Sequence, residues 1–430
     1  MFRTFSKLTA DKPAAAALID GDSGRVTTRA DLLALAEEVA SRTALTAGDV
    51  FAVQLPNGPE FVAALLAALK LELVFAPIDR DARPSEVAAL SDQFGRRPAL
   101  PKGARLLKFT SGSTGKPKAI VWTEENIAAD CTAICATMRI TPQDINLGAI
   151  PFSHSYGFSN LVTPLLMQGT PIVVSNEYLP LSLIALANRH HCTVAPLIPM
   201  VFDHLTAVPR SDGMFETVRT FISAGAPLPP TTSRRFRERF GIDIHSFYGC
   251  SEVGGITYDR EGAAVERGTV GAPLEGVRLD VDPGTHRLTV RSGSVAMGTL
   301  LDAQMFAPLE GAFTTDDLVT TTPDREVVLT GRAGDLINTA GKKVNPREVE
   351  QVILQIDGVR QAKVYGEPAG ARGEVVAAAV VADPSVTREQ VREFCRARLS
   401  PHKVPRIVKL IESIPVDERG KVKRAALAAL

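Results

Sequence analysis

Ten residues, Phe109-Thr110-Ser111-Gly112-Ser113-Thr114-Gly115-Lys116-Pro117-Lys118, combine four hydroxyl groups, two glycines and two lysines. The basic and apolar residues before them predict a strand, so the stretch reads as a loop. Backbone N–H groups, small hydroxyls and ammonium groups in such a loop surround the oxygens of a polyphosphate. The loop is not of the Walker type, because Lys116 is followed by Pro117 instead of a Ser or Thr that opens a helix. The stretch therefore predicts a nucleotide site outside the P-loop class.

Length and composition are typical of a multidomain globular enzyme. The 430 residues exceed what one core usually spans, and hydrophobic and charged residues make up 45% and 22% of the chain. The formal net charge is zero, which gives no indication of a nucleic-acid or membrane partner. The start of the chain has no signal-peptide pattern, and no segment has the apolar length of a membrane span. We therefore expect a cytoplasmic protein.

Cysteine usage agrees with a reducing compartment. The five cysteines are odd in number and scattered along the chain: Cys131, Cys135, Cys192, Cys250 and Cys395. Cys131 and Cys135 have the spacing of one helical turn and would suit a metal pair. Since no His or Cys clusters near them in the sequence, two buried thiols are the better interpretation.

Helix and strand patterns alternate through the first 265 residues. Such alternation predicts a layered α/β domain with a mostly parallel sheet. The expected helices are 30–40, 60–69, 157–167 and 231–240, and the expected strands are 71–78, 145–150, 171–175, 218–223 and 242–247. Short strands at 279–281, 287–290 and 327–330 then indicate a small β lobe. We expect an N-terminal domain over residues 1–331.

A hinge is expected at residues 332–335, where Gly331 and Gly334 would permit unusual backbone angles. Residues 336–430 predict a small, mobile α+β domain. Asn345-Pro346-Arg347-Glu348 has the residues of a helix start with a capping-box acid, and Thr387-Arg388-Glu389-Gln390 has those of a second capping box.

Three further segments carry groups that suit a nucleotide. Tyr248-Gly249-Cys250-Ser251-Glu252 follows a predicted strand and offers a ring that stacks on a base and a carboxylate for Mg²⁺. Asp317 is a good acceptor for ribose hydroxyls, although a solvated turn is the commoner explanation for Asp316-Asp317 alone. Lys421 follows Gly420 near the end of the chain, where a lysine is usually an ordinary surface residue.

Together and in this order, these segments resemble the ANL superfamily of adenylate-forming enzymes, which contains acyl- and aryl-CoA synthetases, adenylation domains and luciferases. The resemblance extends from Leu55-Pro56-Asn57-Gly58 to Gly420-Lys421. The phosphate loop is its most specific part. Tyr248-Gly249-Cys250-Ser251-Glu252 matches a Tyr-Gly-x-Ser/Thr-Glu segment of the family, and residues 331–350 match its hinge region.

The resemblance implies a role for each matched residue. Glu252 would bind Mg²⁺, Lys421 would bridge the carboxylate and the α-phosphate, and His154 would lie beside the acyl pocket. Asp317 would bind the ribose hydroxyls with Arg332 close by. The β- and γ-phosphates would be held by Thr110, Ser111, Gly112, Ser113, Thr114, Gly115, Lys116 and Lys118. The adenine would be framed by Ala224, Gly225, Ala226, Pro227 and Tyr248, and Gly249 and Ser251 would also belong to the nucleotide site.

Three departures from the family pattern stand out. Only about thirty residues separate Pro77-Ile78-Asp79 from the phosphate loop, so a peripheral subdomain is shortened, which would open a wall or create a surface for a homodimer. The usual Thr-Gly-Asp is Thr315-Asp316-Asp317, which would bring an extra negative charge near the ribose. Gly334 replaces the hinge acid or lysine, which would make hinging freer.

The implied function is ATP-dependent activation of a carboxylic acid to an acyl-adenylate, with release of pyrophosphate. Transfer to a thiol, either coenzyme A or the phosphopantetheine of an acyl carrier protein, would then release AMP. An aryl or a medium-to-long acyl acid is favoured by small residues near the expected pocket, Gly249, Gly254 and Gly255, and by aromatic residues expected to form its walls, Phe152, Tyr156, Phe158 and Phe247. Two other classes stay open: a non-catalytic acyl- or nucleotide-binding protein of the same fold, and a kinase-like phosphotransferase that would release ADP.

Overall fold

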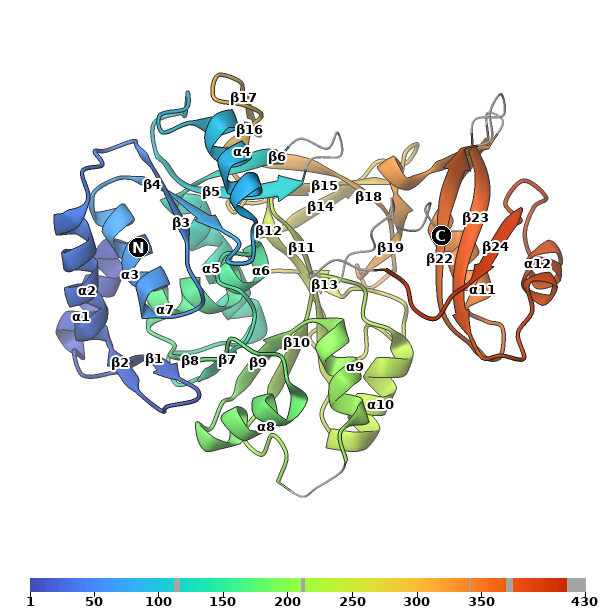
Figure 1. Ribbon diagram of the computed structural model, residues 1–430, viewed down its shortest axis with the longest axis horizontal. Coiled ribbons are helices and arrows are strands. Elements are labelled where there is room, and N and C mark those ends of the chain that lie inside the picture. The colour runs from blue at the N-terminus through green and yellow to red at the C-terminus, as the bar shows by residue number, and fades with distance from the viewer. Residues whose placement is uncertain (112–116, 210–212, 340–341, 369–373, 416–430) are drawn as a thin grey trace. The chain divides into compact units, whose positions relative to one another are not determined.

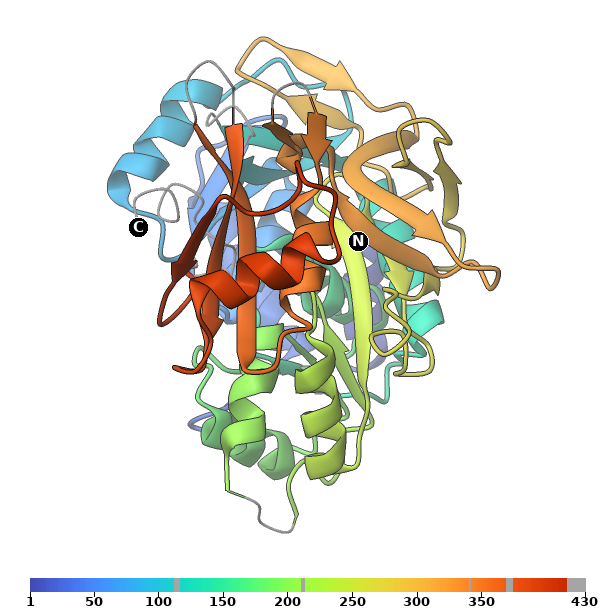
Figure 2. The same ribbon diagram turned by 90° about the vertical axis from the view of Figure 1, so that its right-hand side faces the viewer.

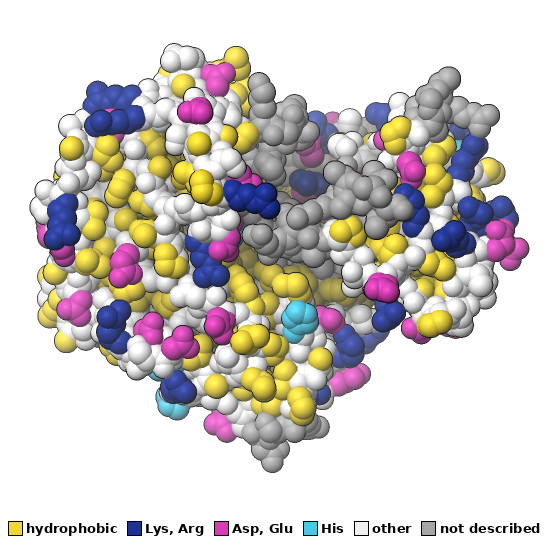
Figure 3. Space-filling view, viewed as in Figure 1, with side chains coloured by type: hydrophobic (Ala, Val, Ile, Leu, Met, Phe, Trp, Pro, Cys, Tyr) yellow, Lys and Arg dark blue, Asp and Glu magenta, His cyan; other side chains and the backbone are white. Residues whose placement is uncertain are grey.

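The computed structural model describes residues 1–430 with the exception of 112–116, 210–212, 340–341, 369–373 and 416–430. The chain forms two compact units (Figure 1). The large unit comprises residues 1–280, 289–313 and 322–327, and the small unit comprises 281–288, 314–321 and 328–430. Within the described parts, no helix is both long and apolar enough to cross a membrane. Acidic and basic side chains are interspersed over the face in Figure 3, as a net charge of zero predicts.

The first sheet of the large unit has a parallel centre and antiparallel edges, in the order β13-β12-β11-β10-β9-β7-β8-β1-β2. Parallel pairing runs from β11 through β10, β9, β7 and β8 to β1. The strands are β1 (Ala16–Asp20), β2 (Val26–Thr28), β7 (Asn146–Gly148), β8 (Ile172–Val174), β9 (Val194–Leu197), β10 (Thr220–Ser223), β11 (Ile244–Cys250), β12 (Gly254–Tyr258) and β13 (Ala272–Pro273). The mostly parallel α/β fold class is thereby confirmed for this sheet.

The second sheet of the large unit has the order β17-β16-β6-β5-β4-β3. Its first three strands along the chain are parallel, and β5 then turns back into antiparallel β6. The strands are β3 (Val50–Gln54), β4 (Val74–Ile78), β5 (Ala104–Ser111), β6 (Pro117–Thr123), β16 (Gly298–Leu300) and β17 (Phe306–Pro308). The short segment before the phosphate loop holds a single helix, α4 (Pro84–Phe94), between β4 and β5.

One apolar core contains side chains from both sheets. It is centred on α3 (Pro59–Lys70), whose residues from Phe61 to Leu69 are all buried, as expected for a helix that is apolar on every side. A second core joins the first sheet to helices on its other face. The remaining helices of the large unit are α1 (Phe2–Asp11), α2 (Arg29–Arg42), α5 (Glu124–Met138), α6 (Ser155–Gly157), the π-helical η1 (Phe158–Val162), α7 (Thr163–Gln168), α8 (Pro180–Arg189), α9 (Pro199–Ala207) and α10 (Pro230–Phe240).

The small unit is built around a three-stranded sheet with two helices on one face (Figure 2). The sheet consists of β22 (Val359–Pro368), β23 (Glu374–Ala382) and β24 (Ile407–Leu410), and the helices are α11 (Pro346–Ile353) and α12 (Arg388–Arg396). A two-stranded sheet precedes them and consists of β20 (Ile337–Thr339) and β21 (Lys342–Val344). Parts of a four-stranded sheet also belong to this unit; its strands are β14 (Arg278–Val281), β15 (Arg287–Arg291), β18 (Ala312–Thr321) and β19 (Val327–Arg332). The short helix η2 (Ala333–Asp335) follows β19.

Two local expectations of the small unit differ from the structure. Asp316-Asp317 lies inside the ten-residue strand β18 and not in a turn. Asn345 caps α11 by accepting a hydrogen bond from the Arg347 N–H, but Glu348 forms an ion pair with Lys403 and no capping box. The second predicted capping box, between Thr387 and Gln390, is confirmed.

Candidate active site

The glycine-rich stretch connects two antiparallel strands. The register of β5 and β6 brings Thr110 opposite Lys118 and Ser111 opposite Pro117. Gly112, Ser113, Thr114, Gly115 and Lys116 lie outside the described residues, as does the side chain of Ser111. A strand-to-strand connection agrees with the expectation that this loop is not of the Walker type, since that loop leads into a helix.

The segments predicted to frame an adenine lie side by side at one sheet edge. Strands β10 and β11 are parallel, with Ser223 opposite Ser246, so Ala224-Gly225-Ala226-Pro227 leaves the sheet next to Tyr248. Gly225 has a φ of +87°, a conformation that favours glycine. Ligands of open α/β sheets bind outside the carboxyl ends of parallel strands, which is where these residues lie.

The Tyr248–Glu252 segment forms the end of β11 and the turn into β12. A Cβ atom on Gly249 would lie 2.2 Å from the backbone oxygen of Gly254, so only glycine fits at this point of the hairpin. The backbone oxygen of Glu252 accepts a hydrogen bond from Ala296 N (2.8 Å), which fixes the turn. Among the described residues, the Glu252 carboxylate has no hydrogen-bond or ion-pair partner and is half-buried.

The donor set around Glu252 fits a magnesium ion carried by a nucleotide. The described residues contain no group of three His, Cys, Asp or Glu side chains arranged for a metal. Magnesium in nucleotide sites is held by one or two carboxylates, water and substrate phosphates, and does not require an all-protein cage. A single unpaired carboxylate at a strand end therefore suits this ion.

Ser251 links the hairpin turn to two neighbouring elements. Its backbone oxygen accepts a hydrogen bond from Trp122 Nε1 at 3.2 Å, and its hydroxyl lies 3.2 Å from the hydroxyl of Ser155. Trp122 belongs to β6 and Ser155 begins α6. The second sheet, through β6, and the segment that carries His154 thus meet at this turn.

His154 is held by residues from the second sheet. Its Nε2 lies 3.2 Å from a carboxylate oxygen of Asp79, the residue that directly follows β4. The Asn57 side chain donates to Ile150 O (2.9 Å) and accepts from Phe152 N (2.7 Å), which secures the chain just before His154. The sequence pattern gives Asn57 no structural role and does not connect Asp79 with His154. Both are far from position 154 in the sequence, where no local pattern could connect them.

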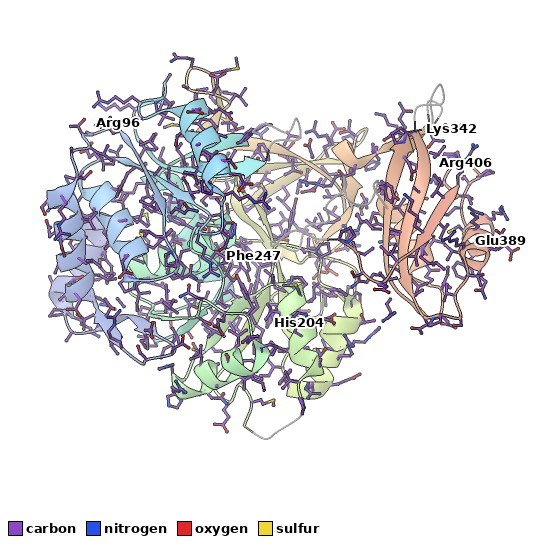
Figure 4. The ribbon with its side chains drawn as sticks, in the orientation of Figure 1. Arg96, His204, Phe247, Lys342, Glu389 and Arg406 are labelled. Carbon is purple, nitrogen blue, oxygen red and sulfur yellow. The ribbon has the colours of Figure 1, made fainter. Side chains whose placement is uncertain are left out.

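Aromatic residues lie next to the predicted adenine edge. The rings of Tyr156 and Phe247 are 5.9 Å apart, and the Tyr156 hydroxyl donates to Ile222 O at 2.9 Å. Burial raises the pKa of Tyr156 well above its usual value. Figure 4 labels Phe247 on β11. Phe152 and Phe158, which we expected to line the acyl pocket, are fully buried in the core.

Asp317 is bound by arginine within the small unit. Its carboxylate lies 2.8 Å from Nε of Arg332, and its backbone N–H donates to Thr315 Oγ1. Burial lowers the pKa of Arg347, an effect that the charges of Glu350 and Asp317 partly offset. Asp316 is on the opposite face of the strand, where it pairs with Arg287 at 3.0 Å. The extra negative charge of Asp316 is therefore directed away from Asp317 and is paired with Arg287.

Gly331 has a packing role. A Cβ atom at this position would lie 2.6 Å from the side chain of Asn345. Neither Gly331 nor Gly334 has a positive φ, so the reason given for glycine at the expected hinge is wrong for this conformation. Lys421 lies outside the described residues.

A cavity of about 210 Å³ lies in the small unit. It is lined by Thr339, Lys342, Val376, His402, Val404 and Arg406. Figure 4 labels Lys342 and Arg406 on this unit. The two cationic side chains and the imidazole suit a cavity that receives an anionic group.

The β5–β6 hairpin, the carboxyl edge of β10 and β11, and the Asp317–Arg332 pair follow one another along the chain in the order expected for an adenylate-forming enzyme. Comparison with known families identifies the group within this class. The profile described as "AMP-binding enzyme" matches residues 5–103 and 96–298, and "AMP-binding enzyme C-terminal domain" matches 348–421. The chain belongs to the AMP-binding enzyme family, within the ANL superfamily, which confirms the resemblance.

The curated relatives include several CoA ligases. Feruloyl-CoA synthase from an Amycolatopsis species is 28% identical over 389 residues, which cover 86% of this chain and 77% of the relative. The 2-succinylbenzoate–CoA ligase of Enterococcus faecalis is 26% identical, with coverage of 78% and 71%. The putative acyl-CoA synthetase YngI of Bacillus subtilis is 28% identical, and the match spans 62% of its length. These relatives support an AMP-forming acid–CoA ligase.

Solved structures confirm the fold. ATP-bound MatB from Rhodopseudomonas palustris superposes with a TM-score of 0.87 at 23% identity, covering 100% of this chain and 98% of that one. The o-succinylbenzoate CoA synthetase of Bacillus subtilis, in complex with an acyl-adenylate, gives 0.84 at 22% identity, with coverage of 98% and 97%. At these identities the likeness concerns the fold alone.

Proposed function

We propose that this protein uses ATP to activate an aryl or a medium-to-long acyl carboxylic acid and then transfers the acyl group to coenzyme A. One observation carries the proposal: Ala224-Gly225-Ala226-Pro227 and Tyr248 lie together at the carboxyl edge of β10 and β11, and Glu252 follows in the next turn. This edge offers a base-binding surface and a carboxylate for a phosphate-bound cation.

The first step joins two anions. A carboxylate oxygen attacks the α-phosphorus of ATP, the bond to the bridging oxygen breaks, and pyrophosphate leaves. Bound Mg²⁺ supplies positive charge to the phosphate oxygens. Lys421 contributes an ammonium group near the carboxylate and the α-phosphate, and the residues from Thr110 to Lys118 hold the leaving pyrophosphate. Glu252 keeps the cation on the phosphates, which lowers the repulsion in the transition state.

The small unit supplies the ribose-binding group. Asp317 accepts hydrogen bonds from the two ribose hydroxyls, and Arg332 holds its carboxylate in place through their 2.8 Å ion pair. A change of orientation at residues 332–335 separates the two steps, because Lys421 is needed for adenylation and not for thiol transfer.

The second step moves the acyl group to a thiol. The sulfur attacks the acyl carbonyl, the C–O bond to the phosphate breaks, and AMP leaves. Lys342 and Arg406 in the small-unit cavity support an acceptor with phosphate groups, as coenzyme A has. The phosphopantetheine of an acyl carrier protein carries the same thiol and is the second acceptor to assay.

Acid-dependent ATP–pyrophosphate exchange tests the adenylation step. We expect exchange with aryl and acyl acids in the wild type and its loss in Lys421→Ala, with Lys423→Ala as the neighbouring control. Exchange that persists in Lys421→Ala would contradict the role of this lysine. Release of ADP would indicate a phosphotransferase, and absence of AMP across a broad acid panel would indicate a non-catalytic binding protein. Mass spectrometry of products with coenzyme A and with carrier protein identifies the acceptor.

A further inference from the structure

Lys108 is a charged residue in the interior of the large unit. It lies in β5, two residues before Thr110, and is only 5% exposed. Side chains alternate between the two faces of a strand, so Lys108 shares a face with Leu106, which is part of the main core. Lys108 stands between the apolar residues Leu107 and Phe109, so a buried position is visible in the sequence.

The ammonium group of Lys108 is surrounded by rings. Its Nζ atom is 4.2 Å from the centre of the Trp122 ring and 5.3 Å from that of Phe158. Within the part of the chain that the structure describes, it has no hydrogen bond and no ion pair. Cation–π contacts compensate only partly for the loss of water around an ammonium group. Burial accordingly lowers the pKa of Lys108 to about 8, while nearby Asp130 and Cys250 raise it.

The nearest acidic group is occupied by other donors. Asp130, on α5, accepts hydrogen bonds from Ser159 Oγ at 2.6 Å and from Gly255 N at 2.9 Å. Its carboxylate is buried, and burial raises its pKa. None of its oxygens comes within the 4.0 Å that defines an ion pair with Lys108. Lys108 therefore has an unused capacity to donate hydrogen bonds.

Asp130 and the rings near Lys108 pack against the hairpin formed by β11 and β12. A Cβ atom on Gly254 would be 2.3 Å from an Asp130 oxygen, and one on Gly255 would be 2.9 Å from the Phe247 ring. Phe247 is also paired with Tyr156. The buried polar groups and the aromatic rings thus lie next to each other at the β11–β12 hairpin, which also carries Tyr248 and Glu252 of the nucleotide site proposed above.

We propose that Lys108 binds the end of the acid substrate that is remote from the activated carboxylate. The inference rests on the function proposed above and names its substrate class: acids with a distal hydroxyl, carbonyl or carboxylate oxygen. The Lys108 ammonium donates a hydrogen bond to that oxygen. A polyphosphate is a poorer match, since a single ammonium between two rings and close to Asp130 offers too few donors for several phosphate oxygens.

Matched pairs of acids test this assignment. Octanoic acid is compared with its terminal hydroxy and dicarboxylic derivatives, and phenylpropanoic acid with its para-hydroxy derivative, in the pyrophosphate exchange assay. We expect kcat/KM to favour the oxygenated members by at least about tenfold in the wild type, because only an oxygenated tail accepts a hydrogen bond from the buried ammonium. In Lys108→Met the preference should fall to near one, with the KM for ATP unchanged.

The control is Lys102→Met, since Lys102 is exposed and precedes the same strand; it should keep the wild-type preference. A preference that is unchanged in Lys108→Met overturns the assignment, as does a raised KM for ATP with an unchanged preference, which would indicate phosphate binding. Absence of exchange with every acid in the wild type overturns adenylation itself. Should Lys108→Met not fold, Lys108→Leu provides the same comparison, since leucine is also apolar and donates no hydrogen bond.

Discussion

The carboxylate of Asp79 lies 3.2 Å from Nε2 of His154. The two residues follow different strands, β4 and β7, so the contact links the ends of the two sheets of the large unit. A carboxylate that accepts the Nε2–H holds the ring in one tautomer and orientation. If His154 lies beside the acyl pocket, Asp79 determines which nitrogen faces the substrate.

Replacement of Asp79 by Asn should lower kcat/KM for the acid about tenfold, as loss of an orienting partner does at other histidines. The oxygen of the introduced amide would retain the hydrogen bond from Asp81 N, and its NH₂ group would face His154 and favour the other tautomer. Exchange kinetics measure the effect. Asp81→Asn changes an exposed carboxylate paired with Arg80 and serves as the control. Equal losses in both variants would refute an orienting role.

Asp316 and Asp317 form a matched pair of neighbours on opposite faces of β18. Their side chains are 59% and 14% exposed, and each is bound to its own arginine. We expect Asp317→Asn to raise the KM for ATP at least about tenfold, because charged hydrogen bonds to the ribose are lost. Asp316→Asn should leave this KM within about twofold, as an exposed ion pair contributes little. Similar KM values in the two variants would be inconsistent with ribose binding by Asp317.

Gly249 allows the close approach of β11 and β12. Since an added Cβ atom would meet the Gly254 backbone oxygen at 2.2 Å, Gly249→Ala should destabilise the large unit by about 1–3 kcal/mol and abolish exchange. The single tryptophan, Trp122, is hydrogen-bonded to the adjacent Ser251, so its fluorescence reports on this hairpin during unfolding. At Gly293 the nearest atom would be 3.4 Å away, and Gly293→Ala should unfold like the wild type. Unfolding of Gly249→Ala at the wild-type midpoint would contradict the steric argument.

Local patterns in the sequence predicted the main elements of the fold. The apolar run in α3 and the strands that precede Ala224 and Tyr248 are visible within short windows, because their period and turn residues are local. The Thr387–Gln390 capping box needs only four consecutive residues and was predicted correctly. The order of the motifs along the chain then identified the segments that form the candidate site.

Long-range contacts account for what the sequence did not reveal. Glu348 was expected to cap α11 but pairs with Lys403, fifty-five residues away. Asp316-Asp317 resembles a turn locally, yet the ladder of β18 overrides that preference. The partners of His154 and the rings around Lys108 come from distant segments, so burial and orientation at these positions required the structure.

Lys108 also makes a testable contribution to stability. Its pKa is about 8 in the folded protein, compared with 10.5 for an ordinary lysine. The folded state therefore disfavours the charged form of Lys108. A shift of this size means that charged Lys108 lowers the free energy of unfolding by about 3 kcal/mol. The penalty is fully present below pH 8. Between pH 8 and 10.5 the unfolded chain binds more protons, so the wild type gains stability relative to an uncharged variant as the pH rises.

Lys108→Met should therefore unfold at a higher denaturant concentration than the wild type at pH 7. Its free energy of unfolding should be larger by up to about 3 kcal/mol, and this difference should shrink towards pH 10. Trp122 fluorescence follows the transition, since its ring lies 4.2 Å from the Lys108 ammonium. Lys102→Met, at an exposed site, should show no such pH-dependent gain. A more stable protein with altered acid preference would mean that Lys108 is retained for substrate binding at the expense of stability, whereas a less stable Lys108→Met at pH 7 would mean that the ammonium group supports the fold.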